Sequence, residues 1–345
     1  MKTILLTGAS GFLGRYLLED LRKKGHKIYA LSRQTQSSLF ENVEWVQADI
    51  SDEASMLRPE LLEKLSNIDM IIHAAALYDL DLGHEPHFRH NVIGTTHVLH
   101  LARLLKKRPH FAYISTIAIA GDSKGNFTEN MFDVGQQFSD PYASTKFAAE
   151  NIIRRATDLP SRSIYRLGIV VGSSIDGFIN KIDGPYVMQR LISNFRSLSP
   201  AISRLKLIPL PYHEHSRLYI IPVNVASSLI CTLAEKVSSR NELSTFHVTG
   251  GGRGVSVRRA IKAILQHYKI DADPFPLPKI MVRQWLLKLV NSPRYGAEYI
   301  YHQWTFSSKN LESELPGYRY PSYEHFSKAI MVYADENYIL KEKSK

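Results

Sequence analysis

The amino-acid sequence predicts an α/β protein built on a doubly wound parallel sheet, with a smaller and discontinuous second domain. Three observations predict this fold: a glycine-rich turn near the start of the chain, strand and helix patterns that alternate as far as residue 171, and a less regular, proline-rich sequence beyond Gly172. Alternating strands and helices require right-handed crossovers, which place the strands parallel in one sheet. A chain of 345 residues is long enough to bury one large core and a smaller one.

The opening stretch, residues 3–15, organises the rest of the chain. A short apolar run fits a buried strand, and leucines at helical spacing follow it. Between the two lie Gly8, Gly11 and Gly14, which permit a sharp turn, let backbone N–H groups approach a phosphate and let the helix pack closely on the strand. The pattern therefore predicts that the pyrophosphate of a dinucleotide binds at the helix N-terminus, where unpaired N–H groups favour negative charge.

The end of the second predicted strand, residues 27–31, bears on the choice of cofactor. A carboxylate at this place usually holds the ribose 2′-hydroxyl of NAD, whereas this sequence has Ser32 and Arg33, which suit a 2′-phosphate. We therefore predict NADP as the cofactor. NAD, with Arg33 as a solvated loop residue, stays an alternative.

The remaining elements follow from their periodicity. The expected strands are 43–47, 69–73, 111–115 and 163–171, and the expected helices are 53–65, with a kink at Pro59 left open, 88–107 and 140–156. Residues 173–215 are rich in loops and prolines, a strand at 219–223 is expected to return to the sheet, and a helix follows over 224–236. We predict a dinucleotide-binding domain of residues 1–172 plus about 216–249, and a substrate-binding domain of about 173–215 plus 250–345.

Composition excludes several classes of protein. The formal net charge is +10, but the basic residues are spread as pairs, without a basic tail or an interleaved aromatic stripe, so we expect no nucleic-acid partner. The histidines form no recognised zinc motif, so we expect no metal site. The single cysteine, Cys231, lies in an apolar run and fits a small buried side chain in a reducing, cytoplasmic protein.

No apolar run reaches the roughly 18–20 residues of a transmembrane helix. Residues 279–290 are mostly apolar with interspersed Lys and Arg residues. They fit either a peripheral contact with a membrane or a helix packed inside the protein. A homodimer also stays open.

The second key stretch opens the helix predicted at 140–156. Asp140 is a favourable N-cap and Pro141 a favourable first helical residue. Tyr142 and Lys146 then lie one turn apart on the same face. An ammonium one turn away is expected to lower the pKa of the phenol from about 10, which suits proton exchange with a carbonyl oxygen as hydride is transferred.

These motifs resemble the extended short-chain dehydrogenases/reductases, in the NAD-dependent epimerase/dehydratase superfamily, over roughly residues 1–250. The resemblance is carried by residues 7–14 (TGASGFLG), 49–50 (DI), 73–76 (HAAA), 91–95 (NVIGT), 115–116 (ST) and 142–146 (YASTK). It implies a Rossmann domain in which Tyr142 is the general acid/base, Lys146 holds the nicotinamide ribose and tunes Tyr142, and Thr116 hydrogen-bonds the reacting carbonyl oxygen.

The same resemblance implies the cofactor contacts. The expected cofactor-binding residues are Gly8, Ser10, Gly11, Phe12, Leu13, Gly14, Arg33, Asp49, Ile50, Ala74, Ala75, Ala76, Tyr142, Lys146, Leu167 and Val170. Asp49 and Ile50 are expected to flank the adenine, with a helix-entry cap as the alternative role of Asp49.

A branch of this superfamily can also be named. Residues 165–172 (YRLGIVVG), followed by 181–186 (KIDGPY), resemble the branch related to thioester reductases and fatty acyl-CoA reductases. Sugar-nucleotide epimerases and dehydratases usually carry an asparagine where this sequence has Ile169.

The sequence thus predicts an NADP(H)-dependent oxidoreductase that reduces a hydrophobic acyl thioester, aldehyde or ketone, or oxidises the matching alcohol. The enzymatic alternative is a sugar-nucleotide epimerase or dehydratase that holds NAD tightly. An alternative of another class is a non-catalytic, NADP-sensing regulatory protein, which would have no need of Thr116, Tyr142 and Lys146 together.

Overall fold

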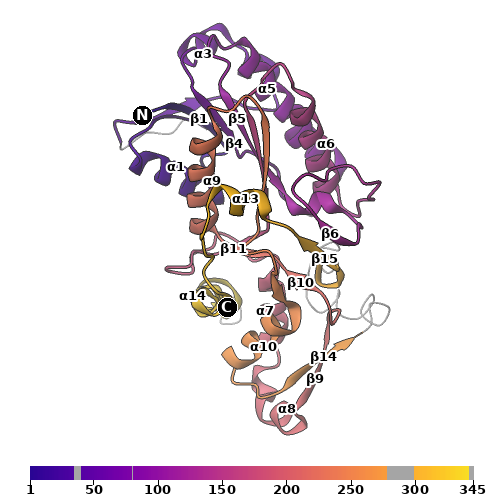
Figure 1. Ribbon diagram of the computed structural model, residues 1–345. Helices are drawn as coiled ribbons and strands as arrows, with labels where there is room; N and C mark the ends of the chain where they lie inside the picture. Colours follow the sequence, from indigo (N-terminus) through magenta and orange to yellow (C-terminus); the bar gives the residue numbers. More distant parts are fainter. Residues whose placement is uncertain (35–39, 80, 278–298, 342–345) are drawn as a thin grey trace.

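A seven-stranded parallel sheet forms the centre of the computed structural model, which describes residues 1–34, 40–79, 81–277 and 299–341 (Figure 1). The strand order is β12-β7-β5-β4-β1-β2-β3. The strands are β1 (Thr3–Thr7), β2 (Lys27–Ser32), β3 (Val43–Gln47), β4 (Met70–His73), β5 (His110–Thr116), β7 (Arg162–Leu167) and β12 (Leu243–Val248). The order reverses between β1 and β4, which confirms the predicted doubly wound sheet and places the ligand-binding crevice at the carboxyl ends of these two strands.

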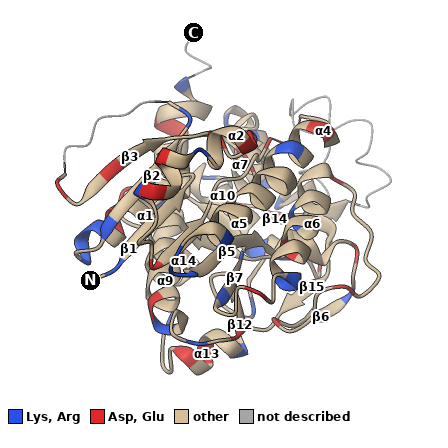
Figure 2. Ribbon diagram, turned by 90° about the horizontal axis from the view of Figure 1, so that it is seen from above, with Lys and Arg blue, Asp and Glu red and all other residues tan. Residues whose placement is uncertain are grey.

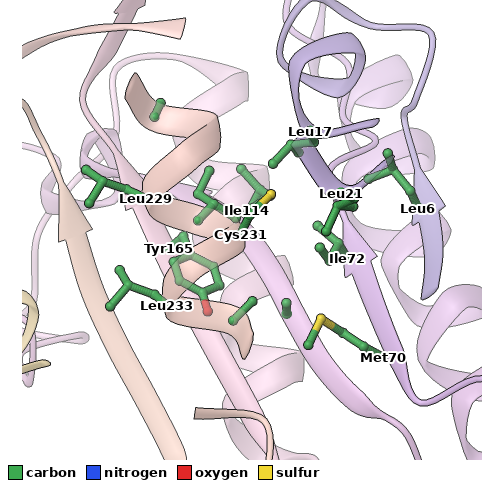
Figure 3. Packing of buried hydrophobic residues seen from close by; sticks show 14 of the residues in the cluster. Leu6, Leu17, Leu21, Met70, Ile72, Ile114, Tyr165, Leu229, Cys231 and Leu233 are labelled. Carbon is green, nitrogen blue, oxygen red and sulfur yellow. The ribbon is translucent and has the colours of Figure 1, made fainter. Parts of the chain in front are cut away.

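Helices cover both faces of this sheet. On one face, α1 (Phe12–Lys23) packs beside α9 (Val223–Val237). Leucines of both helices meet the sheet through Leu6, Ile72 and Ile114 (Figure 3). On the other face, apolar residues of the sheet pack against α5 (Gly94–Leu104) and α6 (Pro141–Arg155) (Figure 1).

Two expected helices are interrupted. The one predicted at 53–65 divides into α2 (Glu53–Met56) and α3 (Pro59–Lys64), because Pro59 lacks an N–H group and starts a helix of its own. The one predicted at 88–107 begins earlier, with α4 (His84–His87), and passes through a π-helical segment, Phe88–Ile93, before α5.

The strand predicted at 163–171 is also divided, at Gly168. A Cβ atom there would lie 2.3 Å from the carbonyl oxygen of Tyr219, so only glycine permits this close approach. After it, β8 (Ile169–Val171) leaves the main sheet and pairs with β11 (Ile220–Pro222). The expectation that 219–223 rejoins the sheet is therefore wrong, and the seventh strand is β12 instead.

The second half of the chain forms a further apolar cluster below the sheet (Figure 1). It is built from α7 (Pro185–Ser193), α8 (Ser199–Leu205), β9 (Leu207–Pro211), α10 (Val257–His267), β14 (Asp273–Leu277) and α14 (Tyr323–Ala334), so the prediction of a loop-rich segment at 173–215 is wrong. Two short strand pairs join β10 (Arg217–Leu218) to β13 (Val255–Ser256) and β6 (Gly125–Phe127) to β15 (Trp304–Phe306). The remaining short elements are 3₁₀ turns at Ile117–Ala120, Arg196–Leu198 and Tyr299–Tyr301 and a π-helical turn at Asp335–Ile339.

The end of the chain returns to the first cluster. Leu311, on α13 (Lys309–Glu314), is buried in the core that α1 and α9 share with the sheet. The division into two domains stays a prediction, since the chain crosses repeatedly between the two sets of elements.

Charged residues of both signs lie interspersed over the molecule, as Figure 2 shows from above. Ion pairs such as Arg103–Asp158 (2.7 Å) and Lys107–Asp69 (2.9 Å) join neighbouring elements. Among the described residues, no helix combines the length and the hydropathy needed to cross a bilayer. The stretch 279–290 lies outside the described residues.

Candidate active site

The glycine turn between β1 and α1 leaves no room for side chains. Gly8 has φ +72°, and a Cβ atom on it would lie 2.6 Å from the backbone nitrogen of Ala75. A Cβ on Gly14 would lie 1.9 Å from the carbonyl oxygen of Gly8, and Gly11 donates its N–H to that same oxygen at 2.9 Å. The turn is thus a backbone cradle in front of the N-terminus of α1, and this cradle fits the pyrophosphate of a dinucleotide.

The three residues next to Gly11 line the same opening. Ser10 is exposed, and Phe12 and Leu13 are half-buried at the start of α1. Phe12 packs against Phe178, with 6.3 Å between the ring centroids. The start of α1 therefore also contacts the segment that follows β8.

The ends of β2 and β3 bring the next predicted residues together. Arg33 is exposed directly after β2, and Asp49 accepts hydrogen bonds from the N–H and the hydroxyl of Ser51, both at 2.9 Å. Burial opposes ionisation of Asp49, but the Ser51 hydrogen bonds and the positive charge of Arg33 leave the pKa of this carboxyl below its usual value. The N-cap of α2 is Asp52, so the alternative role of Asp49 as a helix cap is wrong. Ile50 is buried beside it, against Gly94.

Residues after β4 are held to the glycine turn by a buried hydrogen-bond chain that sequence reasoning did not find. The Thr7 hydroxyl accepts the N–H of Ala75 at 3.2 Å and contacts Nδ1 of His73 at 2.7 Å. Nε2 of His73 lies 3.0 Å from the Thr95 hydroxyl, which donates to the carbonyl of Asn91 at 2.6 Å. Burial lowers the pKa of His73 to about 3, so its ring is neutral and a single tautomer satisfies the whole chain. The chain fixes Ala74 and Ala75 beside Gly8, and Ala76 follows them exposed.

Asn91, the first residue of the motif at 91–95, holds the loop after β4 in place, a role that the sequence did not predict. Its side-chain oxygen accepts the N–H of Leu77 at 2.7 Å, and its nitrogen donates to the Leu77 carbonyl at 3.1 Å. The same nitrogen donates to Thr145, on α6, at 3.1 Å. Asn91 thus ties the loop after β4 to the helix that carries Tyr142.

The predicted start of α6 is confirmed, and it brings Tyr142 to the end of β5. Asp140 is the N-cap and accepts the N–H of Ala143 at 2.7 Å. Thr116, the last residue of β5, is buried, and its hydroxyl accepts the N–H of Ala118 at 3.2 Å. Burial raises the pKa of Tyr142 above its usual value, the charge of Asp140 adds to this shift, and a hydrogen bond with Thr116 opposes it. Thr116 and Tyr142 therefore form one polar pair.

Lys146 lies one turn further along α6, but its amine is engaged elsewhere. Nζ donates to the carbonyl of Ile114 at 2.6 Å and lies 4.2 Å from the centre of the Tyr113 ring. Burial lowers the pKa of Lys146 to about 7, although the charge of Glu150 opposes the shift. The expectation that Lys146 lowers the pKa of Tyr142 is therefore not met in this structure, because burial outweighs it.

Tyr78 covers Tyr142 from the loop after β4. The two rings meet edge to face, with 4.8 Å between their centroids and 71° between their planes. Lys181 lies 4.1 Å from the centre of the Tyr78 ring and forms an ion pair with Asp183 at 3.0 Å. The segment after β8 thus reaches over the entrance to Tyr142.

The last two predicted cofactor residues lie on either side of Gly168. Leu167 ends β7 and is buried, whereas Val170, on β8, is half-buried.

Among the described residues, no group of three or more His, Cys, Asp or Glu side chains is arranged to hold a metal ion.

A buried ion pair between β7 and α6 lies next to the strand that carries Thr116. Arg166, on β7, and Glu150, on α6, both have 0% of their side chains exposed and lie 2.7 Å apart. The Ser115 hydroxyl donates to Glu150 at 2.6 Å, directly before Thr116. The network thus links the strand and the helix that hold the polar pair.

A cavity of about 390 Å³ opens beside the start of α6. Asp140 and Ala143 line it from α6, and Ala118 lines it from the turn after Thr116. The rest of its wall comes from residues 121–124, 137–139 and 301–304, which mix aromatic rings with amide, hydroxyl and amine groups. The cavity thus lies beside the start of α6 and the turn after Thr116, and its mixed lining suits a partly apolar substrate.

Comparison with known proteins agrees with this geometry. Residues 6–230 match the family model described as Male sterility protein. Glycine betaine reductase ATRR of Emericella nidulans is 29% identical over 280 residues, 72% of this chain and 21% of the relative. Carboxylic acid reductase of Segniliparus rugosus is 28% identical over 212 residues, 50% of this chain and 18% of the relative. The chain thus spans about a fifth of the length of these relatives.

Solved structures share the fold. The terminal R domain of the myxalamid PKS-NRPS pathway has a TM-score of 0.76 at 24% identity, over 99% of this chain and 92% of that one. UDP-glucuronic acid 4-epimerase of Bacillus cereus has a TM-score of 0.68 at 16% identity, over 97% of this chain and 100% of that one.

The fold and the site define an extended short-chain dehydrogenase/reductase of the thioester reductase-like branch. Within that class, the chain belongs to the male sterility protein family.

Proposed function

We propose that the protein is an NADP(H)-dependent reductase of a hydrophobic acyl thioester, aldehyde or ketone. The observation that carries the proposal is the pairing of Tyr142 with Thr116 at the end of β5, in the same parallel sheet whose strand β1 ends at the glycine cradle. The relatives named glycine betaine reductase and carboxylic acid reductase support reduction at a carbonyl carbon.

In the proposed reaction, the bound nicotinamide supplies a hydride to the carbonyl carbon. Tyr142 gives its phenolic proton to the carbonyl oxygen, and burial keeps that proton on the phenol until the oxygen becomes negative. Thr116 helps to stabilise the developing oxyanion, and Lys146 would hold the ribose of the bound nicotinamide. An aldehyde or ketone becomes the alcohol in this one step, whereas a thioester becomes a hemithioacetal, whose C–S bond breaks to release the thiol and leave the aldehyde. In the reverse direction, the same groups take a proton from the alcohol.

The direct test is a screen of the purified protein with NADPH against acyl thioesters, aldehydes, ketones and sugar nucleotides, followed by absorbance of the reduced nicotinamide. We expect oxidation of NADPH with one of the first three classes and not with sugar nucleotides. The second candidate, a sugar-nucleotide epimerase or dehydratase, is favoured by the fold it shares with the Bacillus cereus epimerase. Tightly bound NAD that co-purifies with the protein would support that candidate and contradict our proposal.

Arg33 is proposed to select NADP over NAD. Its exposed guanidinium follows β2, where the adenosine ribose of a dinucleotide lies in doubly wound folds. Replacing Arg33 with Ala is expected to weaken NADPH binding by about tenfold or more and to leave NADH binding nearly unchanged, because the lost charge pairs only with the 2′-phosphate. Isothermal titration with both cofactors measures this, and Lys23→Ala, a loss of charge at the far end of α1, is the control. Equal losses for both cofactors would contradict the role.

Reduction is expected to slow as the pH rises through about 7, the value to which burial lowers the pKa of Lys146. Below that pH the amine is charged and can hold the cofactor ribose with all three of its protons, and above it the charge and one proton are lost. The measurement is the pH profile of kcat/KM. The Lys146→Arg variant keeps its charge and is expected to give a flatter profile at a lower rate. A wild-type profile that does not fall across this range would refute the assignment.

A further inference from the structure

Large apolar side chains are exposed together at the far end of the second cluster. Leu198 is 54% exposed, Leu205 73%, Leu207 58% and Phe275 55%. We call these four residues, with the exposed Pro209, the tip patch. They belong to the 3₁₀ turn before α8, to α8, to β9 and to β14, which lie at the end of the molecule farthest from α3 (Figure 1).

The strand pair β9–β14 directs its apolar residues to both sides. Pro209 pairs with Phe275 in register, and both face outward. The alternate residues Ile208 and Leu210 are buried in the second cluster, at 5% and 2% exposure. Because side chains alternate across a strand, the inner face completes the core and the outer face is left as a second apolar surface.

The turn between α8 and β9 presents two of the leucines. Lys206 has φ +59°, in the left-handed region, and it ends α8. Leu205 and Leu207 therefore project on either side of this turn, and Lys206 pairs with Asp271. The end of α8 and this turn form the extreme lower end of the ribbon (Figure 1).

The segment that carries most of the patch is basic. Residues 185–213 contain Arg190, Arg196, Arg204 and Lys206 and no Asp or Glu. Two carboxylates in the segment before and within β14 form ion pairs, Asp271 with Lys206 and Asp273 with Lys262 at 2.8 Å, which leaves Arg196 and Arg204 as the cations offered for lipid contact. The tip therefore combines exposed leucines with a surplus of cations.

We propose that the tip patch docks the protein on an anionic lipid surface. Leu205, Leu207 and Phe275 enter the interfacial region of the bilayer, and Arg196 and Arg204 contact lipid phosphates. Binding of this kind increases with buried apolar area and with attraction to anionic headgroups, and both are present at the tip. Exposed apolar residues beside arginines fit a fluid bilayer, which needs no matching cavity. The proposal does not depend on the proposed reaction.

The test is co-sedimentation of the full chain with vesicles of phosphatidylcholine, with and without about one third of phosphatidylglycerol. We expect binding to the anionic vesicles only, weakened by salt. The double variant Leu205→Glu/Leu207→Glu is expected to bind about tenfold more weakly or not at all. The double variant Arg196→Gln/Arg204→Gln is expected to bind more weakly and with less dependence on salt. The matched control is Leu104→Glu, a leucine 51% exposed on α5, which should bind like the unchanged protein.

Circular dichroism and thermal melting show that each variant is folded before it is compared. Reduction of a water-soluble substrate by the Leu205→Glu/Leu207→Glu variant should be unchanged, which separates this proposal from the proposed function. The proposal is overturned if the unchanged protein fails to sediment with anionic vesicles, or sediments equally with neutral ones. Unaltered binding by the Leu205→Glu/Leu207→Glu variant would overturn it as well, as would a tip that binds only a soluble acidic protein.

Discussion

Replacing Tyr142 with Phe is expected to reduce turnover by about 10²- to 10⁴-fold, the range usual for loss of a positioned proton donor. The ring would keep its contact with Tyr78, 4.8 Å between centroids, so the shape of the site is preserved. Binding of NADPH should remain nearly intact, because the glycine cradle is formed by other residues. Steady-state kinetics and a fluorescence titration of NADPH measure the two quantities.

The matched control is Tyr78→Phe, which removes the same hydroxyl group from the neighbouring ring. We expect it to retain most of the activity, since Tyr78 has no proposed part in proton transfer. A Tyr142→Phe variant as active as the unchanged protein would rule out the mechanism. If neither the unchanged protein nor the variant turns over any substrate, the result favours the alternative of a cofactor-sensing regulatory protein.

Replacing Glu150 with Ala is expected to lower the free energy of unfolding by about 3–5 kcal/mol, because it leaves the guanidinium of Arg166 buried without a counter-charge. Both side chains are fully buried, and Glu150 also accepts hydrogen bonds from Ser115 and Arg154. Urea unfolding followed by circular dichroism measures the change.

The control for this prediction is Asp158→Ala. Asp158 pairs with Arg103 through two hydrogen bonds of 2.7 and 2.9 Å, but at the surface, with 49% and 41% of the two side chains exposed. Solvent screens this pair, so its loss should cost only about 0–1 kcal/mol. If Glu150→Ala and Asp158→Ala lower the free energy of unfolding by the same amount, the prediction that burial makes the loss of Glu150 more destabilising is wrong.

The parts of the fold that the sequence predicted depend on local signals. Glycines at fixed offsets predicted the turn after β1, and Asp140 followed by Pro141 predicted the start of α6 to the residue. Both signals act within a few residues of the chain, so neighbouring side chains decide the outcome.

The parts that the sequence missed depend on distant contacts. The division of a strand at Gly168 follows from the approach of Tyr219, and β12 joins the sheet only because β7 offers it an edge. Arg166 looked like any strand residue, although it is fully buried against Glu150. No periodicity in the sequence reports such contacts.

The site divides in the same way. Tyr142 and Thr116 come together as expected, because both lie at the ends of elements whose positions the sequence predicted. The direction of the Lys146 amine was not predictable, since it is set by the carbonyl of Ile114 and the ring of Tyr113 on β5. His73 and Asn91 lay within quoted motifs, yet their hydrogen-bond partners are spread over several elements.

The path of the chain around β7 bears on how the protein can be divided. Its register joins Arg162–Leu167 to Leu243–Val248, yet those two segments are separated along the chain by α7, α8 and β9. A fragment that stopped at residue 172 would expose β7 as a bare edge, open to self-association. The seven-stranded sheet therefore needs segments from both sides of the α7–β9 insertion. No fragment that ends before β12 contains the complete sheet.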